Sequence, residues 1–354
     1  MASIDRLSSL PDGVICHILS FLPTKRRVAT SVLGKRWRFL WVHVPCLHFN
    51  FSGYKFRKKG TQASDIINRV IFRHKAKIMD TLTLNRVKYN EYQLETWITT
   101  AMDRSIRNLY LELSFDTFPR YLYNCKTIVH LKLENKRASL SAVKNVSLPS
   151  LKKLYVHNLV CENDDALPRF LSGCTSLNEL NMAFLFEKDE DFVGCINISS
   201  PTIKMLQIAF NNSHHFEYRM IINAPALRYL QVEDYDLECI TIPITIISLV
   251  EADISLKHYR FSNLETNYNS TVVKFLHSLS YVKCLKISGR IFDEPTIRTC
   301  KINSRVGSPF SVSTYLGRRG ILRTEPISSL NTRTFFDHQG LLEFDTPVKA
   351  SAAS

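Results

Sequence analysis

The sequence predicts an α/β protein in which a short helical module precedes a solenoid with a parallel strand face and an irregular C-terminal tail. Three observations predict this class. Helical apolar spacing dominates the first 45 residues, a six-residue leucine pattern recurs from residue 79, and that pattern stops after residue 287. The chain has 354 residues, of which 45% are hydrophobic and 22% charged, so a sizeable core is expected.

The recurring pattern is apolar, any, any, Leu, any, apolar. Its fourth position falls at Leu82, Leu109, Leu131, Leu154, Leu180, Leu206, Leu230 and Leu285. A weaker copy is assigned to Ile247, Val250 and Ala252. Nearly all of the steps fit the ~20 to 29 residues of a leucine-rich repeat. Each unit is too small to bury its own apolar face, so neighbouring units stack and align their short strands into a parallel sheet.

The segments between the predicted strands are helical or irregular. Residues 166–174 read as a helix whose end at Gly173 suits a C-cap. Alternation along each strand directs every second side chain to the outer surface. We expect that surface to carry Lys132, Tyr155, Asn181, Gln207 and Gln231, although these residues form no recognisable ligand code.

The N-terminal module predicts three short helices. The first begins near Pro11 and ends at Pro23, and Thr24 is placed to cap the second. So small a module buries too little surface to be stable alone, and it has more apolar side chains than its small core needs. We therefore expect one face to dock on another protein. The apolar stripes are Ile15, Ile18, Leu19 and Leu22, then Val28 and Val32, then Leu33, Trp37, Leu40 and Trp41.

This segment resembles a known family. The stretches LPD at 10–12, ILSFLP at 18–23, TSVL at 30–33 and KRWR at 35–38, followed by Leu40-Trp41, look like the F-box of plant F-box proteins. Joined to the repeats, the chain resembles the plant F-box/leucine-rich-repeat group, which often ends in an FBD domain. Gly34 departs from the serine usual in the family, and Arg26-Arg27 stand where an acidic residue is common; we expect both arginines to be solvated.

The resemblance implies a non-catalytic subunit of a Skp-cullin-F-box ubiquitin ligase. The F-box would bind a Skp-type adaptor, which bridges to a cullin and its RING partner, while the repeats hold an unknown target protein. No cofactor and no metal are implied. Which residues face the adaptor and which face the internal core stays open, and Trp37 and Trp41 are equally balanced between the two. The expected interface residues are Leu10, Pro11, Ile15, Ile18, Leu19, Leu22, Val32 and Trp37.

The expected organisation is an F-box at 1–48, a basic linker and solenoid entry at 49–77, a leucine-rich-repeat solenoid at 78–288 and an irregular tail at 289–354. An FBD-like ending is missing from the tail. A truncated or alternatively spliced form, or an artefact of the gene prediction, would explain that ending. The alternative function is accordingly a repeat scaffold, or a decoy that occupies the adaptor without supporting transfer.

The net charge of +14 raises a nucleic-acid hypothesis, but the excess is local. Residues 1–80 hold 15 basic and 4 acidic side chains, whereas 81–250 hold 17 and 19. The basic run Lys55–Lys59 lies in the expected linker, where such runs are usually solvated. Trp37 shares an apolar stripe with Leu33 and Leu40, so its ring is not expected to stack on a base. Nucleic-acid binding is not favoured.

Enzymatic and membrane functions lack their motifs. No GxSxG, P-loop, GxGxxG or HExxH sequence occurs, His214-His215 point apart on a strand, and 187–191 lack the pattern of a calcium loop. Nine cysteines without a CxxC pair indicate reduced, intracellular usage. With no signal peptide evident and no apolar run of ~20 residues, we expect a cytoplasmic or nuclear protein without a membrane span.

Overall fold

The computed structural model describes residues 6–53, 62–114, 119–140, 145–185, 194–210, 219–234, 240–243, 246–256, 275, 278–279, 282–288, 311–315 and 325–326. They belong to two compact units, one ending at Leu185 and the other beginning at Phe186. The predictions for Lys55–Lys59, for 187–191 and for His214-His215 lie outside the described residues, as does most of the tail.

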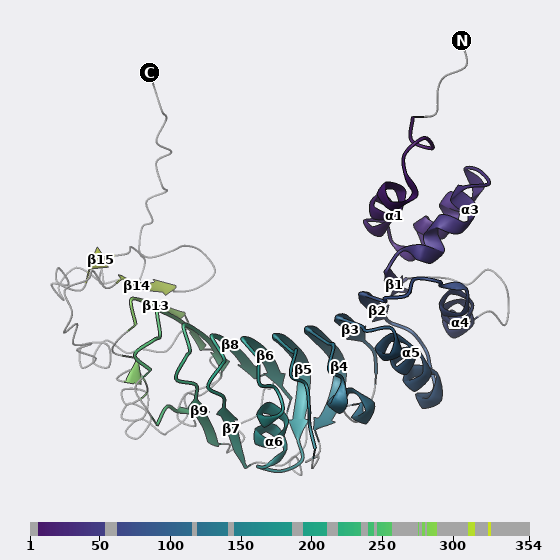
Figure 1. Ribbon diagram of the computed structural model, residues 1–354. Helices are drawn as coiled ribbons and strands as arrows, with labels where there is room; N and C mark the ends of the chain where they lie inside the picture. Colours follow the sequence, from purple (N-terminus) through teal and green to yellow (C-terminus); the bar gives the residue numbers. More distant parts are fainter. Residues whose placement is uncertain are drawn as a thin grey trace, which may run out of the picture. The chain divides into compact units, whose positions relative to one another are not determined.

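The first unit begins with the predicted helical module (Figure 1). It contains α1 (Asp12–Ser20), α2 (Thr24–Ala29), the 3-10 turn η1 (Thr30–Val32), α3 (Trp37–Leu40) and η2 (Trp41–His43). Pro11 precedes α1 and Pro23 precedes α2, where the fixed φ of proline suits the start of a helix. The third predicted helix is one α-helical turn followed by a 3-10 turn, and its boundary lies between two buried tryptophans.

The same unit continues as a parallel sheet whose strands follow chain order. One row of leucines runs across it, because Leu82 pairs with Leu109, which pairs with Leu131, and the row continues through Leu154 to Leu180. All of these side chains are buried, so the stacking that the repeat predicts is confirmed. The strands are β1 (Cys46–Asn50), β2 (Thr81–Asn85), β3 (Asn108–Glu112), β4 (His130–Leu140), β5 (Lys153–Cys161) and β6 (Glu179–Phe184).

The first strand, β1, is a copy of the repeat that lies before the predicted series, which begins at residue 79. Val44, Leu47 and Phe49 are buried and reproduce the six-residue pattern, and Leu47 pairs with Leu82 in the leucine row. The sheet therefore begins at Cys46, upstream of the first predicted copy. This copy was not predicted because Leu47 lies 35 positions before Leu82, with a helix between them, and that step is longer than the usual repeat.

Helices cover one face of this sheet. They are α4 (Ala63–Arg73), α5 (Glu91–Asp103), the 3-10 helix η3 (Arg120–Asn124) and α6 (Ala166–Ser172), and Figure 1 shows α4 and α5 on the same side of the strands. Ile67 of α4 and Trp97 of α5 are buried there. On the strands, buried residues alternate with partly exposed ones, as β1 and β3 show. The other face of the sheet is thus left for solvent or a partner.

The second unit repeats this construction. β8 (Met205–Phe210), β10 (Tyr229–Asp234), β12 (Glu251–Leu256), β13 (Cys284–Ser288) and β14 (Ser311–Tyr315) pair in parallel, and β15 (Glu325–Pro326) joins β14 antiparallel. A second parallel sheet contains β7 (Cys195–Ser199), β9 (Arg219–Asn223) and β11 (Ile240–Thr241). The leucine pattern does not predict β14, because Val312 and Thr314 occupy the positions of its leucine and its last apolar residue.

The weak copy of the repeat was placed two residues too early. Leu230 pairs with Ala252, so the true copy is Leu249, Ala252 and Ile254, all of which are buried. Ile247, the predicted first position, is 78% exposed. The error arose because alanine occupies the position that elsewhere carries leucine, so the alignment slipped to Val250. With this correction, the α/β class and the parallel solenoid are confirmed.

Gly173 follows α6 and has a φ of −80°, which any residue can adopt. The prediction that it is a C-cap is confirmed by position, but the reason for glycine is a close approach between chain segments. A Cβ atom at this position would collide with the backbone carbonyl of Val146. Leu148 also donates its backbone N–H to the carbonyl of Gly173 at 2.9 Å, so the two segments are held together.

Candidate functional site

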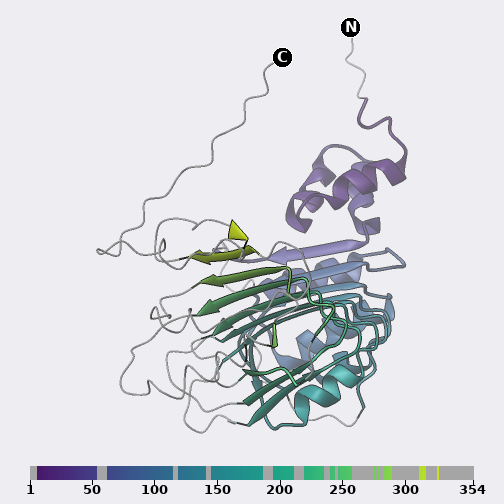
Figure 2. The ribbon, with the colours of Figure 1, turned by 90° about the vertical axis from the view of Figure 1, so that its left-hand side faces the viewer.

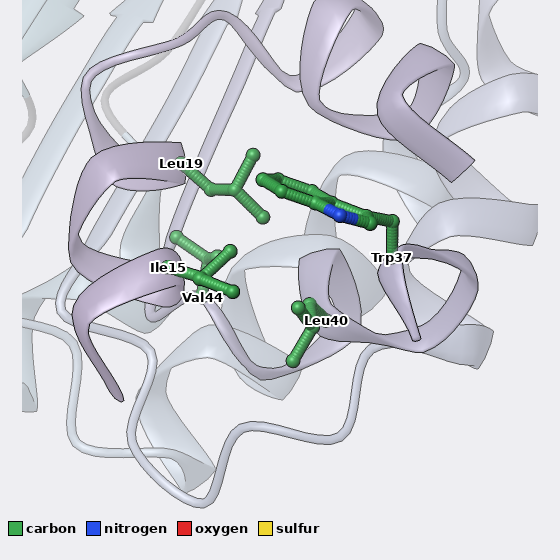
Figure 3. Close-up of a cluster of buried hydrophobic side chains, with 5 residues drawn as sticks. All are labelled: Ile15, Leu19, Trp37, Leu40 and Val44. Atoms are coloured by element: carbon green, nitrogen blue, oxygen red, sulfur yellow. The ribbon is translucent and has the colours of Figure 1, made fainter. Parts of the chain in front are cut away.

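The helical module has a small apolar core. Ile15 and Leu19 of α1 meet Trp37 and Leu40 of α3 and the following Val44 (Figure 3). Ile15, Leu19 and Trp37 are 0%, 1% and 4% exposed. As predicted interface residues, these three are therefore not available for direct contact with an adaptor in this structure, and they support the surface from within. Trp41 is buried as well, so both tryptophans lie in the interior of this structure and not on its surface.

The outer surface of the module carries a second apolar set. On α1 it is formed by Val14, Ile18 and Phe21, which follow i, i+4, i+7 spacing, and Phe21 is 75% exposed. Val32, which ends η1, is 87% exposed, and the next residue, Leu33, is also exposed. These five residues are here called the apolar patch; Leu7 and Phe39 of the same module are exposed as well. Such a set on so small a module is typical of a docking surface.

The eight residues predicted for the adaptor interface thus divide into three groups. Ile18, Val32 and Pro11 are exposed, whereas Leu10 and Leu22 are partly buried against the core. Ile15, Leu19 and Trp37 are the buried group. Val14, Phe21 and Leu33 were missed as candidates. A second stripe on α1, offset from the buried one, could have revealed Val14 and Phe21 in the sequence.

Within the basic run at 35–38, Arg36 and Trp37 bond to the segment that precedes α1 and to its first residue. Arg36 Nε donates to Asp12 Oδ1 at 2.7 Å, and Arg36 Nη2 donates to the carbonyl of Leu10 at 2.5 Å. Trp37 Nε1 donates to Ser8 Oγ at 2.8 Å. Arg36 and Trp37 therefore hold the segment that presents Leu10 and Pro11. A tryptophan fixed in this way does not offer its ring to a nucleic-acid base.

The uncovered face of the sheet is the second candidate region. Tyr110, Lys132, Tyr155 and Asn181 occupy one register row on β3–β6, which confirms the surface position predicted for the last three. Lys132 Nζ lies 4.7 Å from the centroid of the Tyr155 ring and 2.7 Å from Glu134 Oε1. The rings of Tyr155 and His157 stack with centroids 4.4 Å apart.

The electrostatics of this cluster follow from its partial burial. Burial lowers the pKa of His157, so its ring is neutral at neutral pH and can stack as an aromatic surface. Burial also raises the pKa of Tyr155. Bonding to Glu134 raises the pKa of Lys132, which keeps this lysine charged. The cluster therefore offers aromatic rings with one tethered cation, a composition common in protein interfaces.

The corresponding face in the second unit is more polar. Gln207, Gln231, Asp253 and Lys286 share a register row, which confirms the surface position predicted for the two glutamines. Gln207 Nε2 donates to Gln231 Oε1 at 2.7 Å, and Lys286 Nζ lies 2.6 Å from Glu251 Oε1. Burial raises the pKa of Asp253, although Lys286 acts in the opposite direction. In contrast to the first unit, the described residues of this row from β8 to β13 include no aromatic side chain.

Metal binding and thiol reactivity depend on the His, Cys, Asp and Glu side chains of the described residues. Over that part of the chain no group of three or more His, Cys, Asp or Glu side chains could hold a metal ion. Burial raises the pKa of Cys161 and of Cys174 to about 12, so both thiols stay protonated and serve as small core residues. Among the same residues, no helix is long and apolar enough to cross a bilayer.

The helical module and the leucine-spaced parallel strands together define an F-box followed by leucine-rich repeats. An F-box domain profile matches residues 7–49, and the profile described as "FBD-associated F-box protein At5g56370, LRR repeats" matches residues 94–288. The chain belongs to the plant F-box/LRR-repeat family. The predicted resemblance is thereby confirmed.

Curated relatives come from Arabidopsis thaliana. The chain is 32% identical over 293 residues to the F-box/FBD/LRR-repeat protein At3g52680, covering 80% of this chain and 60% of that protein. It is 30% identical over 381 residues to the F-box/LRR-repeat protein At4g14103, covering 96% and 93%. The chain therefore spans about three fifths of the length of the first relative and nearly all of the second.

Proposed function

We propose that this chain is a substrate-recognition subunit of a Skp-cullin-F-box ubiquitin ligase and has no catalytic activity of its own. The observation that carries the proposal is the apolar patch, Val14, Ile18, Phe21, Val32 and Leu33, which the F-box core leaves uncovered. A Skp-type adaptor would cover this patch and connect the chain to a cullin and its RING partner. Family membership supports the proposal, because F-box proteins generally act as adaptors.

The chemical step would take place on other subunits. A target lysine amine would attack the thioester carbonyl of a charged ubiquitin-conjugating enzyme, form an amide bond and release the enzyme thiol. This chain would contribute proximity, since holding two reactants together raises their effective concentration. A cytoplasmic or nuclear location belongs to the same proposal, and imaging of a fluorescent fusion tests it.

The patch is tested by adaptor capture. The wild-type chain is expected to retain a purified Skp-type adaptor, and a Phe21→Asp, Val32→Asp variant is expected to lose at least 100-fold in affinity, about 2.7 kcal/mol, because two charges would be desolvated in an apolar interface. Both side chains are highly exposed, so the fold should survive. Phe72→Asp is the matched control, since Phe72 is 90% exposed on α4, outside the F-box.

Two results of the capture experiment would count against the adaptor role or against the patch as its docking surface. If the wild-type chain binds no adaptor, the ligase proposal fails and the scaffold alternative gains. If the Phe72→Asp control loses binding as fully as the double variant, the docking surface is not the patch. A chain that binds the adaptor but supports no ubiquitin transfer with the complete ligase would fit the decoy alternative.

We also propose that the target lies on the uncovered sheet face, with Tyr110, Lys132, Tyr155 and His157 as its main contact region. Tyrosines supply large, rigid contact surfaces, and residues of this type carry much of the binding energy at protein interfaces. Glu134 and Tyr155 hold Lys132 in place, so little side-chain freedom remains to be lost on binding.

This second proposal is tested by proximity labelling in plant cells. A Tyr110→Ala, Tyr155→Ala variant is expected to lose the proteins that the wild-type chain labels specifically, while the adaptor remains labelled. Thr83→Ser is the control, because Thr83 lies in the same register row and serine keeps the hydroxyl that lies 3.0 Å from His48 Nδ1. An unchanged set of labelled proteins in the tyrosine variant would place the target elsewhere.

A further inference from the structure

β1 is the terminal strand of its sheet, with β2 as its strand neighbour. An edge strand has backbone groups that no other strand satisfies, and proteins usually cover or blunt such an edge. Here the F-box covers it. Figures 1 and 2 both show the F-box helices beside β1. The polar contacts to β1 come from α2.

Two side chains of α2 bond to the backbone of β1. Thr24 Oγ1 accepts a hydrogen bond from the backbone N–H of His48 at 2.8 Å. Arg27 Nη1 donates to the carbonyl of Cys46, while Arg27 Nη2 donates to the carbonyl of Leu22 at 2.7 Å. Thr24 was predicted to cap its own helix; the structure shows no such bond, and its hydroxyl serves the strand instead.

Arg27 was also predicted to be solvated, and that prediction is wrong. Its side chain is fully buried, whereas its neighbour Arg26 is exposed. Burial lowers the pKa of Arg27, because the charged guanidinium has lost its water. A guanidinium suits this place because its fork reaches two carbonyls at once, one in the F-box and one in the sheet.

A second set of contacts joins the F-box to the segment that follows α4. The carbonyl of Val42 accepts from the backbone N–H groups of Lys75 at 2.8 Å and Ala76 at 3.1 Å. His74 Nε2 lies 2.8 Å from the carbonyl of Val44, and Arg104 Nη1 lies 3.1 Å from His74 Nδ1. Because Arg104 can only donate, Nδ1 accepts and the His74 proton lies on Nε2.

We propose that Arg27 is a positioning residue that locks the F-box to the first strand of the sheet, so that the apolar patch and the sheet face of the first unit move as one body. The lock rests on the contacts above alone. Its consequence for ubiquitin transfer rests on the proposed function, because a fixed geometry would determine which lysines can reach the conjugating enzyme.

Hydrogen exchange on the full-length chain tests the lock. In Arg27→Met, a residue of similar length without donors, the backbone amide of His48 is expected to exchange about tenfold faster, while the amides of Ile15 and Leu19 in α1 keep their rates. Thr24→Val, which removes the acceptor of the same amide, is expected to have the same local effect. Arg26→Met is the matched control and should leave all of these rates unchanged.

Two exchange patterns would overturn the lock. An unchanged His48 amide in both variants would show that α2 does not secure the strand. Equal acceleration throughout α1 in Arg27→Met, without a local effect in Thr24→Val, would show that Arg27 stabilises only the F-box itself through Leu22.

A second readout separates positioning from stability. In the reconstituted ligase, the lysines of this chain that receive ubiquitin can be mapped by mass spectrometry. Arg27→Met is expected to bind the adaptor within twofold of the wild type but to spread modification over more lysines, while Arg26→Met keeps the wild-type map. An unchanged map with retained adaptor binding overturns the positioning role. If the wild-type chain does not bind the adaptor, the ligase proposal is refuted instead. The exchange results still test whether Arg27 holds the F-box to β1.

Discussion

Replacing Leu19 by Asp is expected to unfold the F-box, whereas replacing its neighbour Ile18 by Asp is expected to leave the F-box folded and weaken adaptor binding. The two residues are adjacent in α1 but lie on different faces, since Leu19 is 1% and Ile18 is 38% exposed. An unpaired carboxylate in the core costs roughly 3–5 kcal/mol. That is a large part of the ~5–15 kcal/mol by which a typical domain is stable.

Chemical denaturation monitored by tryptophan fluorescence measures this difference, because Trp37 lies in the F-box core. Leu19→Asp should lose the F-box transition, while Ile18→Asp should keep its midpoint close to that of the wild type. Adaptor capture on the same samples then separates loss of fold from loss of surface. A folded Leu19→Asp variant would show that the core assigned to Ile15, Leu19 and Trp37 is wrong.

Replacing Gly173 by Ala is expected to destabilise the first unit by ~1–3 kcal/mol, and replacing Gly13 by Ala is expected to stabilise the chain by up to ~1 kcal/mol. The substitution is chemically identical at both sites. At Gly173 the new methyl group meets the backbone carbonyl of Val146, which cannot rotate away. At Gly13, in α1, a Cβ atom meets nothing within 4 Å, so only the lower entropy of the unfolded chain matters.

Urea titrations of the two alanine variants provide the test, with far-UV circular dichroism as the signal. The midpoint should fall for Gly173→Ala and rise slightly for Gly13→Ala, with little change in slope. A neutral Gly173→Ala variant would mean that the segments around Val146 and Gly173 can separate at low cost, contrary to the hydrogen bond that joins Leu148 to Gly173.

The repeat was the most predictable part of the fold, because its physical basis is local and recurrent. Each copy needs a buried leucine at the same register position, so the strands from Leu82 to Leu285 can be located from the sequence. The prediction is wrong or incomplete where that residue is not leucine or where the step between copies is longer. Ala252 packs in the leucine row, but alanine is not the residue that the pattern requires there. Leu47 is separated from the next copy by an inserted helix.

The exposed residues of the F-box were harder to predict, because helical spacing defines apolar stripes without showing which stripe points toward the core. Ile15 and Ile18 belong to the same apolar set, yet one is in the core and the other on the surface. Arg27 illustrates the same limit for charged residues. Nothing in the local sequence of Arg27 distinguishes it from Arg26. Arg27 is buried against strand β1, and this strand was not predicted from the sequence.

The placement of β1 has a consequence for engineering. The F-box profile ends at residue 49, inside a strand that runs from Cys46 to Asn50 and belongs to the sheet. If the F-boxes of two relatives were exchanged at this residue, the junction would fall inside β1. The strand would then combine residues from two proteins, and its contacts with α2 and β2 would no longer match. Chimeras should therefore be joined beyond Asn85, where β2 ends, so that the graft carries its own first strand and its own supporting helix α4.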